Sequence, residues 1–562
     1  MSDRVRYRLI VMAAVLTVVV VPVLVQLVRL QVVQHTYYLD LAKALTEHTE
    51  SVTAPRGRIW DRRGHLLADN VSRYQVSADP GNVNLDNVVK KLAPTLNLSP
   101  GDLRATLAGA QSQVVLSTSL SLAAGRAVQD LNLWAVYSTP YWQRAYPEHQ
   151  LLSQVLGFVN AKGEGYYGVE GIYDSALRGQ RKEWEATQDA WFQPSPFDPA
   201  YPANPRSGTD LVLTIDRTFQ ALTEAELQRA LAGTGAKSGT IIVMDPRTGA
   251  ILAMASLPSF DPNNYLTTSK ERFVNPAVSG TYEPGSVFKV LTMAAALQEG
   301  LVTPDTKYND TACLEVGGLS VCNWDRKAHG TTNMVDLLAR SLNVGAATLS
   351  TRMGGQTFYK YVQAFGIGQT TGIDLQFEES GNLRMPGDLD WHASDLGTHA
   401  FGQGLSVTPI QMIAAVAAVA NEGMLMRPYV VAQKIDSGQV LTAKPTPNGR
   451  VISSQVAHTL SGMLEQAVER ESSPARVPGY RIAGKTGTAQ IPIAGGYDDP
   501  WTIGSFVGWG PVSDPRLIIL VKLDRPTSSM WGAETAAPVF SRLASRLFVL
   551  MGIPTDKAMA SK

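Results

Sequence analysis

Residues 284–289 read Pro-Gly-Ser-Val-Phe-Lys, and this stretch predicts both a local fold and a chemistry. Pro284-Gly285 ends an extended segment, while residues 287–298 are rich in helix-forming side chains, so we expect Ser286 at the amino end of a helix. Lys289 follows one turn later, and helical residues three apart have Cβ atoms about 5–6 Å from each other. The pattern therefore predicts a serine nucleophile beside a lysine base, because a serine hydroxyl needs a nearby base to be activated.

Two later segments extend the predicted site, namely Ser341-Leu-Asn343 and Lys485-Thr-Gly-Thr488. Ser341 and Asn343 stand where a loop enters a predicted helix, so both side chains can project into one cleft. We expect Ser341 to pass a proton to the leaving amine, and Asn343 to hold a substrate amide and orient Lys289. A lysine base must be neutral, which requires burial and a neighbouring cation, and Lys485 is expected to be that cation.

The third segment is also expected to bind substrate. Lys485, Thr486 and Thr488 offer an amine and two hydroxyls to a substrate carboxylate. Gly487 lacks a side chain, and we expect a peptide substrate to approach there as an added strand. The backbone N–H groups of Ser286 and Thr488 are predicted to form the oxyanion hole.

Each segment also has a simpler interpretation. The first is compatible with an ordinary surface helix start, and Ser341 or Asn343 with the capping of a helix. Residues 479–486 moreover match the letters of a nucleotide-binding P-loop. We reject the P-loop, which requires a buried strand before it and a helix after it. Here a polar, proline-containing loop precedes these residues, and Gly487-Thr-Ala-Gln-Ile-Pro492 is not helix-forming.

The amino-terminal region predicts a membrane anchor. Residues 9–28 are almost wholly apolar, and about 20 helical residues rise roughly 30 Å, the thickness of the hydrocarbon core. Arg4, Arg6 and Arg8 precede them, so we expect a single pass with residues 1–8 in the cytoplasm and the bulk outside, at the plasma (inner) membrane. A cleaved signal peptide is the alternative, but the apolar run exceeds a usual h-region and the nearest Ala-x-Ala, at 42–44, lies far beyond it.

At 562 residues the chain exceeds what one core usually organises. We expect a mixed pedestal domain at 29–192, a proline-rich connection at 193–206, a catalytic domain at 207–555 and a tail at 556–562. The catalytic domain is predicted to be α+β. Its expected order is helix 217–232, strands 239–244 and 250–256, a helical insert, strands 480–491, 502–509 and 516–524, and helix 534–551. That order predicts an antiparallel sheet sandwiched by helices.

Composition adds two constraints. Lys+Arg and Asp+Glu balance at 49 each, which removes the global positive field of a nucleic-acid-binding protein. Cys313 and Cys322, the two cysteines of the chain, bracket a predicted hairpin that turns at Gly317-Gly318. Outside the cytoplasm they can form a disulfide, and two reduced thiols are the alternative.

With these residues in view, the chain resembles the class B penicillin-binding proteins, the bitopic D,D-transpeptidases of bacterial peptidoglycan synthesis. Glu-Pro-Gly-Ser-x-Phe-Lys at 283–289 is similar to the division-type rather than the elongation-type branch. Beyond the three segments, the resemblance covers Arg56-Gly-Arg-Ile-Trp-Asp-Arg-Arg-Gly64, Gly168-Val-Glu-Gly-Ile-Tyr173, Tyr282-Glu-Pro-Gly-Ser286 and Gly402-Gln-Gly-Leu-Ser-Val-Thr-Pro409. It implies a dimerisation-type pedestal and a transpeptidase domain with the fold of the serine β-lactamases.

The resemblance also implies a function in septal or elongation cell-wall synthesis. Ser286 would attack the penultimate carbonyl of a stem peptide ending in D-Ala-D-Ala, and a neighbouring strand's amine would take the acyl group. β-Lactams would acylate the same serine. The implied partners are peptidoglycan stem peptides, lipid-linked precursor strands, a SEDS-type polytopic glycosyltransferase and other cell-wall synthesis membrane proteins. The resemblance implies no metal or organic cofactor.

Two rival functions use the same residues. Glu378-Glu-Ser-Gly-Asn382 resembles the deacylation motif of class A β-lactamases, although an anchor and a pedestal do not suit such an enzyme and residues 371–378 also resemble a penicillin-binding protein. The other rival is an antibiotic sensor or a catalytically idle scaffold. Replacement of Ser286 by Ala distinguishes a scaffold, which keeps its function, from an enzyme, which loses it.

Overall fold

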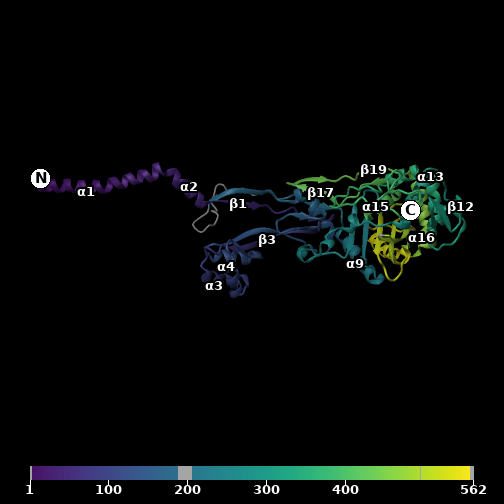
Figure 1. Ribbon diagram of the computed structural model, residues 1–562, viewed down its shortest axis with the longest axis horizontal. Coiled ribbons are helices and arrows are strands. Elements are labelled where there is room, and N and C mark those ends of the chain that lie inside the picture. The colour runs from purple at the N-terminus through teal and green to yellow at the C-terminus, as the bar shows by residue number, and fades with distance from the viewer. Residues whose placement is uncertain (1–2, 188–204, 494, 557–562) are drawn as a thin grey trace. The chain divides into compact units, whose positions relative to one another are not determined.

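The computed structural model describes residues 3–187, 205–493 and 495–556. Helix α1 (Asp3–Val28) contains the predicted span 9–28 and continues through a π turn (Arg29–Val33) before α2 (His35–Thr46), as Figure 1 shows from the amino terminus onward. Within the described ranges, this is the one helix long and apolar enough to cross a membrane, and none of α1 is buried in protein. The predicted connection 193–206 lies outside the described residues except for its last two positions.

The described residues form two compact units, which we treat separately. The first unit takes its residues from 1–55, 71–143 and 179–207. Three of its helices begin at side-chain caps, Asn84, Ser99 and Ser121, whose oxygens accept backbone N–H groups of the first turn. Besides α1 and α2, the helices and strands of this unit are α3 (Leu85–Leu96), α4 (Pro100–Gly109), α5 (Leu122–Asp130), β1 (Glu47–Thr53), β4 (Val114–Leu120), β8 (Arg181–Thr187), and most of β3 (Leu66–Ala78) and β5 (Val136–Ala145).

The second unit is built on a five-stranded antiparallel sheet, which confirms the predicted α+β sandwich. Its strand order is β11 (Ile251–Leu257), β10 (Ser238–Met244), β22 (Leu517–Asp524), β21 (Gly496–Gly510) and β20 (Ala483–Ile493). The apolar run of β22 is explained by its central place, where both faces are buried. Strand β20 is at the edge, so one side of its backbone is unpaired within this sheet.

Alternation along the strands sorts side chains between two cores. On β10, Ile241 and Val243 pack with α9 (Arg217–Thr234) and α18 (Ala537–Leu550), whereas Ile242 and Met244 belong to the core on the other face. That other core is covered by α11 (Lys289–Gln298), α15 (Pro409–Ala420) and α16 (Ser454–Glu471). The predicted helix 534–551 is divided in two, α17 (Gly532–Thr535) and α18.

The helical insert carries a set of short strands and helices above the sheet edge. The elements that matter for the site are α12 (Met334–Ala339), α13 (Asn343–Ala364), β12 (Lys307–Asp310), β13 (Cys313–Val316), β14 (Leu319–Cys322) and β15 (Gly330–Asn333). Strands β13 and β14 form the predicted hairpin, and a disulfide joins Cys313 to Cys322. Of the two alternatives, the structure therefore contains the disulfide and not the two reduced thiols. The other elements of the insert are α10 (Pro276–Ser279), α14 (Asp395–Thr398), β16 (Met424–Met426) and β19 (Pro447–Arg450).

Residues 56–70 and 144–178 lie within the span predicted for the pedestal, and in the structure they are part of the second unit. Strand β2 (Ile59–Trp60) pairs in parallel with β9 (Asp210–Leu213), and β9 pairs with β17 (Val431–Asp436), which pairs with β18 (Gln439–Thr442). Buried ion pairs also hold residues 56–70 and 144–178 together within the second unit. Glu170 accepts the Nε groups of Arg56 at 2.7 Å and of Arg144 at 2.6 Å, and it is fully buried. The other elements here are α6 (Ser153–Leu156), β6 (Phe158–Val159), β7 (Gly165–Tyr166), α7 (Gly168–Ile172) and α8 (Asp174–Leu177).

Candidate active site

The first predicted segment forms a tight turn that leads into a buried helix. Ser286 lies in a 3-10 turn (Gly285–Phe288), and α11 begins at Lys289, so the α-helix starts three residues after the serine. Gly285 has φ +56°, a conformation that favours glycine, and it approaches Thr488 of the edge strand. Lys289 Nζ lies 3.0 Å from Ser286 Oγ, which confirms that the two side chains share one face.

The hydrogen bonds of Lys289 match a neutral amine. Its Nζ is 2.5 Å from the Ser341 carbonyl oxygen and 2.7 Å from Asn343 Oδ1. In the neutral form of Lys289 these two acceptors take both N–H bonds, which leaves its lone pair for the Ser286 hydroxyl; in the protonated form Nζ donates to Ser286 Oγ as well. Burial, and then the charge of Lys485, hold the pKa of Lys289 well below its ordinary value. Lys289 is therefore arranged as a base for Ser286.

Ser341 links the two lysines. Its hydroxyl oxygen accepts from Lys485 Nζ at 3.0 Å and lies 3.2 Å from Lys289 Nζ. The residue has φ +59°, in the left-handed region that costs a non-glycine residue energy, and such strain is concentrated at functional sites. Burial lowers the pKa of Lys485 to about 7, so this amine exchanges its proton near neutral pH.

Asn343 has both of its amide atoms engaged within the protein. Its Oδ1 accepts from Lys289, and its Nδ2 donates to the Cys322 carbonyl at 3.0 Å. The expected orientation of Lys289 is thus present, and Nδ2 carries a second N–H, which this bond leaves for the expected contact with a substrate amide at the cavity. The capping alternative does not hold, because the N-cap of α13 is Leu342 and neither Ser341 nor Asn343 caps the helix.

Lys485, Thr486, Gly487 and Thr488 lie within β20, an uninterrupted strand. A P-loop lysine stands at the start of a helix, so the strand rules that interpretation out. The Thr486 hydroxyl accepts from Lys485 Nζ at 3.3 Å, and the Thr488 hydroxyl accepts the Gly532 N–H at 3.0 Å. Both threonines are half-buried at the cavity that contains Ser286.

Gly487 also serves the packing of the protein itself. A Cβ at this position would stand 2.3 Å from Ser505 Oγ and 2.9 Å from Val287 Cγ2, which are protein atoms beneath the strand. The missing side chain therefore lets β20 lie against the turn that carries Ser286. The position of β20 at the edge of the sheet is consistent with the approach of an added substrate strand, which stays a prediction.

The site opens into a cavity of about 830 Å³. Ser286, Ser341, Asn343, Thr486 and Thr488 line it, so three segments distant in the sequence meet at one cavity. Lys289 and Lys485 lie beneath this surface, with 1% and 2% of their areas exposed. The two amines are thus shielded from water while Ser286 is accessible from the cavity.

Two family models match the chain. The penicillin binding protein transpeptidase domain matches residues 239–545, and the penicillin-binding protein dimerisation domain matches residues 51–213. The first match covers more than half of the chain. The chain belongs to the penicillin-binding protein transpeptidase family. The two models together match the class B organisation, although they do not distinguish a division-type from an elongation-type member.

Relatives of known name agree with this assignment. Stage V sporulation protein D of Bacillus subtilis is 35% identical over 90% of this chain and 80% of its own length. The peptidoglycan D,D-transpeptidase FtsI of Escherichia coli is 30% identical over 90% of this chain and 85% of its own. Penicillin-binding protein 3 of Mycobacterium tuberculosis, complexed with aztreonam, superposes with a TM-score of 0.70 at 27% identity, covering 90% of this chain and 98% of that chain.

Within this family, the glutamate that suggested a β-lactamase is used for structure. Glu378 accepts the backbone N–H of Thr371 at 2.7 Å and that of Gly372 at 2.9 Å. Its carboxylate therefore closes a loop, and Glu378 is absent from the described residues that line the cavity. A deacylation base has to reach the acyl group, so this penicillin-binding protein does not have the β-lactamase arrangement at Glu378.

The sequence motifs missed part of the cavity wall. Trp324 and Trp531 pack edge to face, with ring centroids 5.1 Å apart, and both line the cavity. They come from loops that follow β14 and β22, more than 200 residues apart. Neither tryptophan stands in a periodic pattern, so local sequence carries no signal of their contact. The pair identifies an aromatic wall that the motif search could not find.

Proposed function

We propose that this protein is a serine D,D-transpeptidase that cross-links peptidoglycan stem peptides ending in D-Ala-D-Ala and is acylated by penicillin. One observation carries the proposal: the buried Lys289 amine, with its pKa lowered, lies 3.0 Å from the accessible Ser286 hydroxyl. Family membership supports the substrate class, and the aztreonam complex of the mycobacterial relative supports acylation by β-lactams.

The first half-reaction forms an ester. Lys289 Nζ takes the Ser286 proton as Oγ attacks the penultimate carbonyl carbon, and the N–H groups of Ser286 and Thr488 stabilise the oxyanion. The bond to the terminal D-Ala nitrogen then breaks. Ser341 gives its proton to that nitrogen and is reprotonated from the lysines it contacts, so D-Ala leaves as a neutral amine.

The second half-reaction transfers the acyl group. An amine from a neighbouring peptidoglycan strand attacks the ester carbon, loses a proton to the lysine–serine network, and displaces Ser286 Oγ, which regains its hydrogen. A new amide bond forms and no other reactant is consumed. Lys485 and the hydroxyls of Thr486 and Thr488 hold the carboxylate of the donor peptide, while the edge of β20 pairs with its backbone.

The proposed place of this chemistry is outside the cytoplasm. Helix α1 is the single-pass anchor of the plasma membrane, and the arginines at 4, 6 and 8 hold its amino end inside. Residues 29–192 then act as the pedestal for a catalytic domain at 207–555. The partners are lipid-linked precursor strands and a SEDS-type glycosyltransferase, contacted through the span and the pedestal. A topology reporter placed after residue 556 that is active only in the cytoplasm would contradict this orientation.

Mass spectrometry after incubation with a penicillin tests the function. We expect a stable adduct of one drug mass on Ser286, and no adduct on the Ser286→Ala variant. Ser350→Ala is the matched control, because Ser350 is a buried serine of α13 that bonds the Leu396 carbonyl rather than the lysines. Rapid turnover of the drug would indicate a β-lactamase. An unmodified Ser286 would favour the catalytically idle scaffold.

A further inference from the structure

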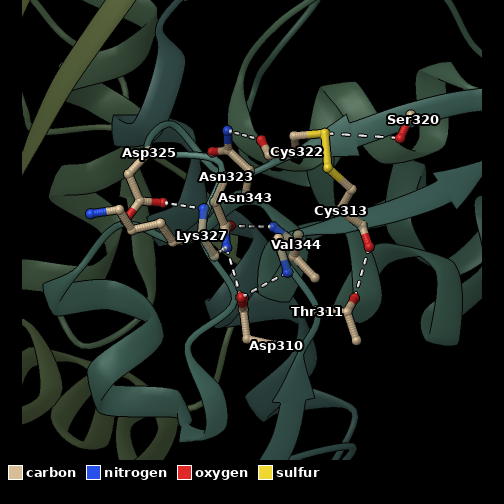
Figure 2. The surroundings of a disulfide bond; sticks show 11 residues. Asp310, Thr311, Cys313, Ser320, Cys322, Asn323, Asp325, Lys327, Asn343 and Val344 are labelled. Atoms are coloured by element: carbon tan, nitrogen blue, oxygen red, sulfur yellow. Dashed lines mark hydrogen bonds between the residues drawn. A yellow bond between two sulfur atoms is a disulfide. The ribbon is translucent and has the colours of Figure 1, made fainter.

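The helix that carries Asn343 has its amino end held by a residue from another segment. The N-cap position of α13 makes no side-chain hydrogen bond. The Val344 N–H instead donates to Asn323 Oδ1 at 3.1 Å, across 21 residues of sequence. Figure 2 shows Asn323 between Asp310 and Val344, in the loop that follows the disulfide hairpin. Asn323 therefore replaces the missing cap.

Asn323 is fully engaged in this task. Its side chain is buried, with 2% of the residue exposed, and Nδ2 donates to Asp310 Oδ1 at 2.7 Å and to the Lys327 carbonyl at 3.2 Å. Its backbone N–H donates to the Ala312 carbonyl, and its own carbonyl accepts the Arg326 N–H. The amide atoms are used within the protein, so Asn323 has no free donor for a ligand although it borders the cavity.

Asp310 anchors Asn323 from below. It is 1% exposed and accepts, besides Asn323, the N–H of His329 at 3.1 Å and the Tyr308 hydroxyl at 3.1 Å. A buried carboxylate with this many donors is held in one orientation, and buried polar networks of this kind are rigid when every member is paired. The loop from Cys322 to Asn323 is thus fixed relative to β12, independently of substrate.

The same loop holds Asn343. The Cys322 carbonyl accepts Asn343 Nδ2 at 3.0 Å, which turns Asn343 Oδ1 toward Lys289. If Asn343 turned away, one Lys289 N–H would lose its acceptor and could point at Ser286 Oγ. The lone pair would then no longer face the nucleophile. Small displacements of reacting groups cost large factors in rate.

We propose that Asn323, anchored on Asp310, is a positioning residue for acylation, fixing the amino end of α13 so that Asn343 and Ser341 hold Lys289 toward Ser286. The inference rests on the proposed acyl transfer. It assigns Asn323 an effect on the rate of the chemical step and none on the reversible binding of substrate, because the residue acts through α13.

Stopped-flow measurement with a fluorescent penicillin separates these two quantities. For Asn323→Leu, which keeps the volume and removes the hydrogen bonds, we expect the acylation rate constant to fall about ten- to a hundredfold. The dissociation constant of the reversible complex is expected to stay unchanged. Gln220→Met is the matched control, since Gln220 is a buried amide that bonds both backbone groups of Met254 at 2.8 Å, away from the cavity. It should lower thermal stability and leave acylation intact.

A second variant keeps the test decisive if Asn323→Leu folds poorly. Asn323→Gln keeps the amide donors and the acceptor but moves them by one methylene group, so its acylation rate should fall between the wild type and the Leu variant. Wild-type rates in either variant, a change confined to reversible binding, or an equal loss in Gln220→Met would each overturn the inference. Absence of acylation in the unchanged protein would overturn the proposed function itself.

Discussion

Lys485 Nζ donates to Ser341 Oγ over 3.0 Å, and this bond joins the edge strand of the sheet to the entrance of α13. Since the same hydroxyl lies 3.2 Å from Lys289 Nζ, Ser341 stands between an amine whose pKa is held well below its ordinary value and one whose pKa burial lowers to about 7. A proton can therefore pass from one lysine toward the other without bulk water. This bridge supports the proposed role of Ser341 as the proton carrier.

Ser341→Ala is expected to reduce the rate of penicillin acylation about 10²-fold, because the route of the proton to the leaving nitrogen is lost. Thermal unfolding should shift little, as the hydroxyl is half-buried. The Ser350→Ala variant serves again as the comparison. An acylation rate for Ser341→Ala equal to that of Ser350→Ala would contradict the role of Ser341.

The rate of acylation should depend on pH in a bell-shaped manner. It rises with pH as Lys289, whose pKa is lowered by burial and by Lys485, loses its proton. It falls as the pH passes about 7 and Lys485 loses the charge that holds the substrate carboxylate. Lys485→Arg keeps the charge at all these values, so the falling limb should disappear in rates normalised to each variant's maximum. A falling limb that persists in the variant would show that another group causes it.

Gly487→Ala tests the packing of the edge strand. The new Cβ would overlap Ser505 and Val287, and overpacking of this kind costs about 1–3 kcal/mol in the free energy of unfolding. We also expect slower acylation, because β20 and the turn of Ser286 must separate. Gly462→Ala, on α16, has no atom within 4 Å of its new Cβ and should be neutral or stabilising. Equal stabilities of the two variants in denaturant titration would refute the tight approach.

Glu170→Gln tests the buried ion pairs of the second unit. The change leaves the guanidinium groups of Arg56 and Arg144 buried beside a neutral amide, so unfolding should become easier by about 3 kcal/mol or more. Glu469→Gln breaks an exposed pair with Arg476 and should cost less than about 1 kcal/mol. If both variants unfold at the same denaturant concentration, the buried ion pairs of Glu170 contribute no more to stability than the exposed pair of Glu469.

Local sequence signals succeeded where a residue's neighbours along the chain determine its environment. The order of the expected helices and strands predicted an antiparallel sheet with two covered faces, and Ser286 and Lys289 are close because they are three residues apart. The span in α1 followed from length and polarity alone. The ordered triple of motifs also identified the five catalytic candidates and the family.

Only the tertiary structure shows which side chains from distant segments contact and position the residues of the site and of the core. Asn323 caps α13 from a different segment, Gly487 lets its strand pack against Ser505 and Val287, and Glu170 pairs with two arginines from distant positions. None of these contacts has a local pattern, because periodicity reports which face of an element is buried and carries no record of the partner that covers it. These partners come from distant parts of the chain that meet only in the folded protein. Here they bury the Lys289 amine, lower its pKa and hold it beside the Ser286 hydroxyl.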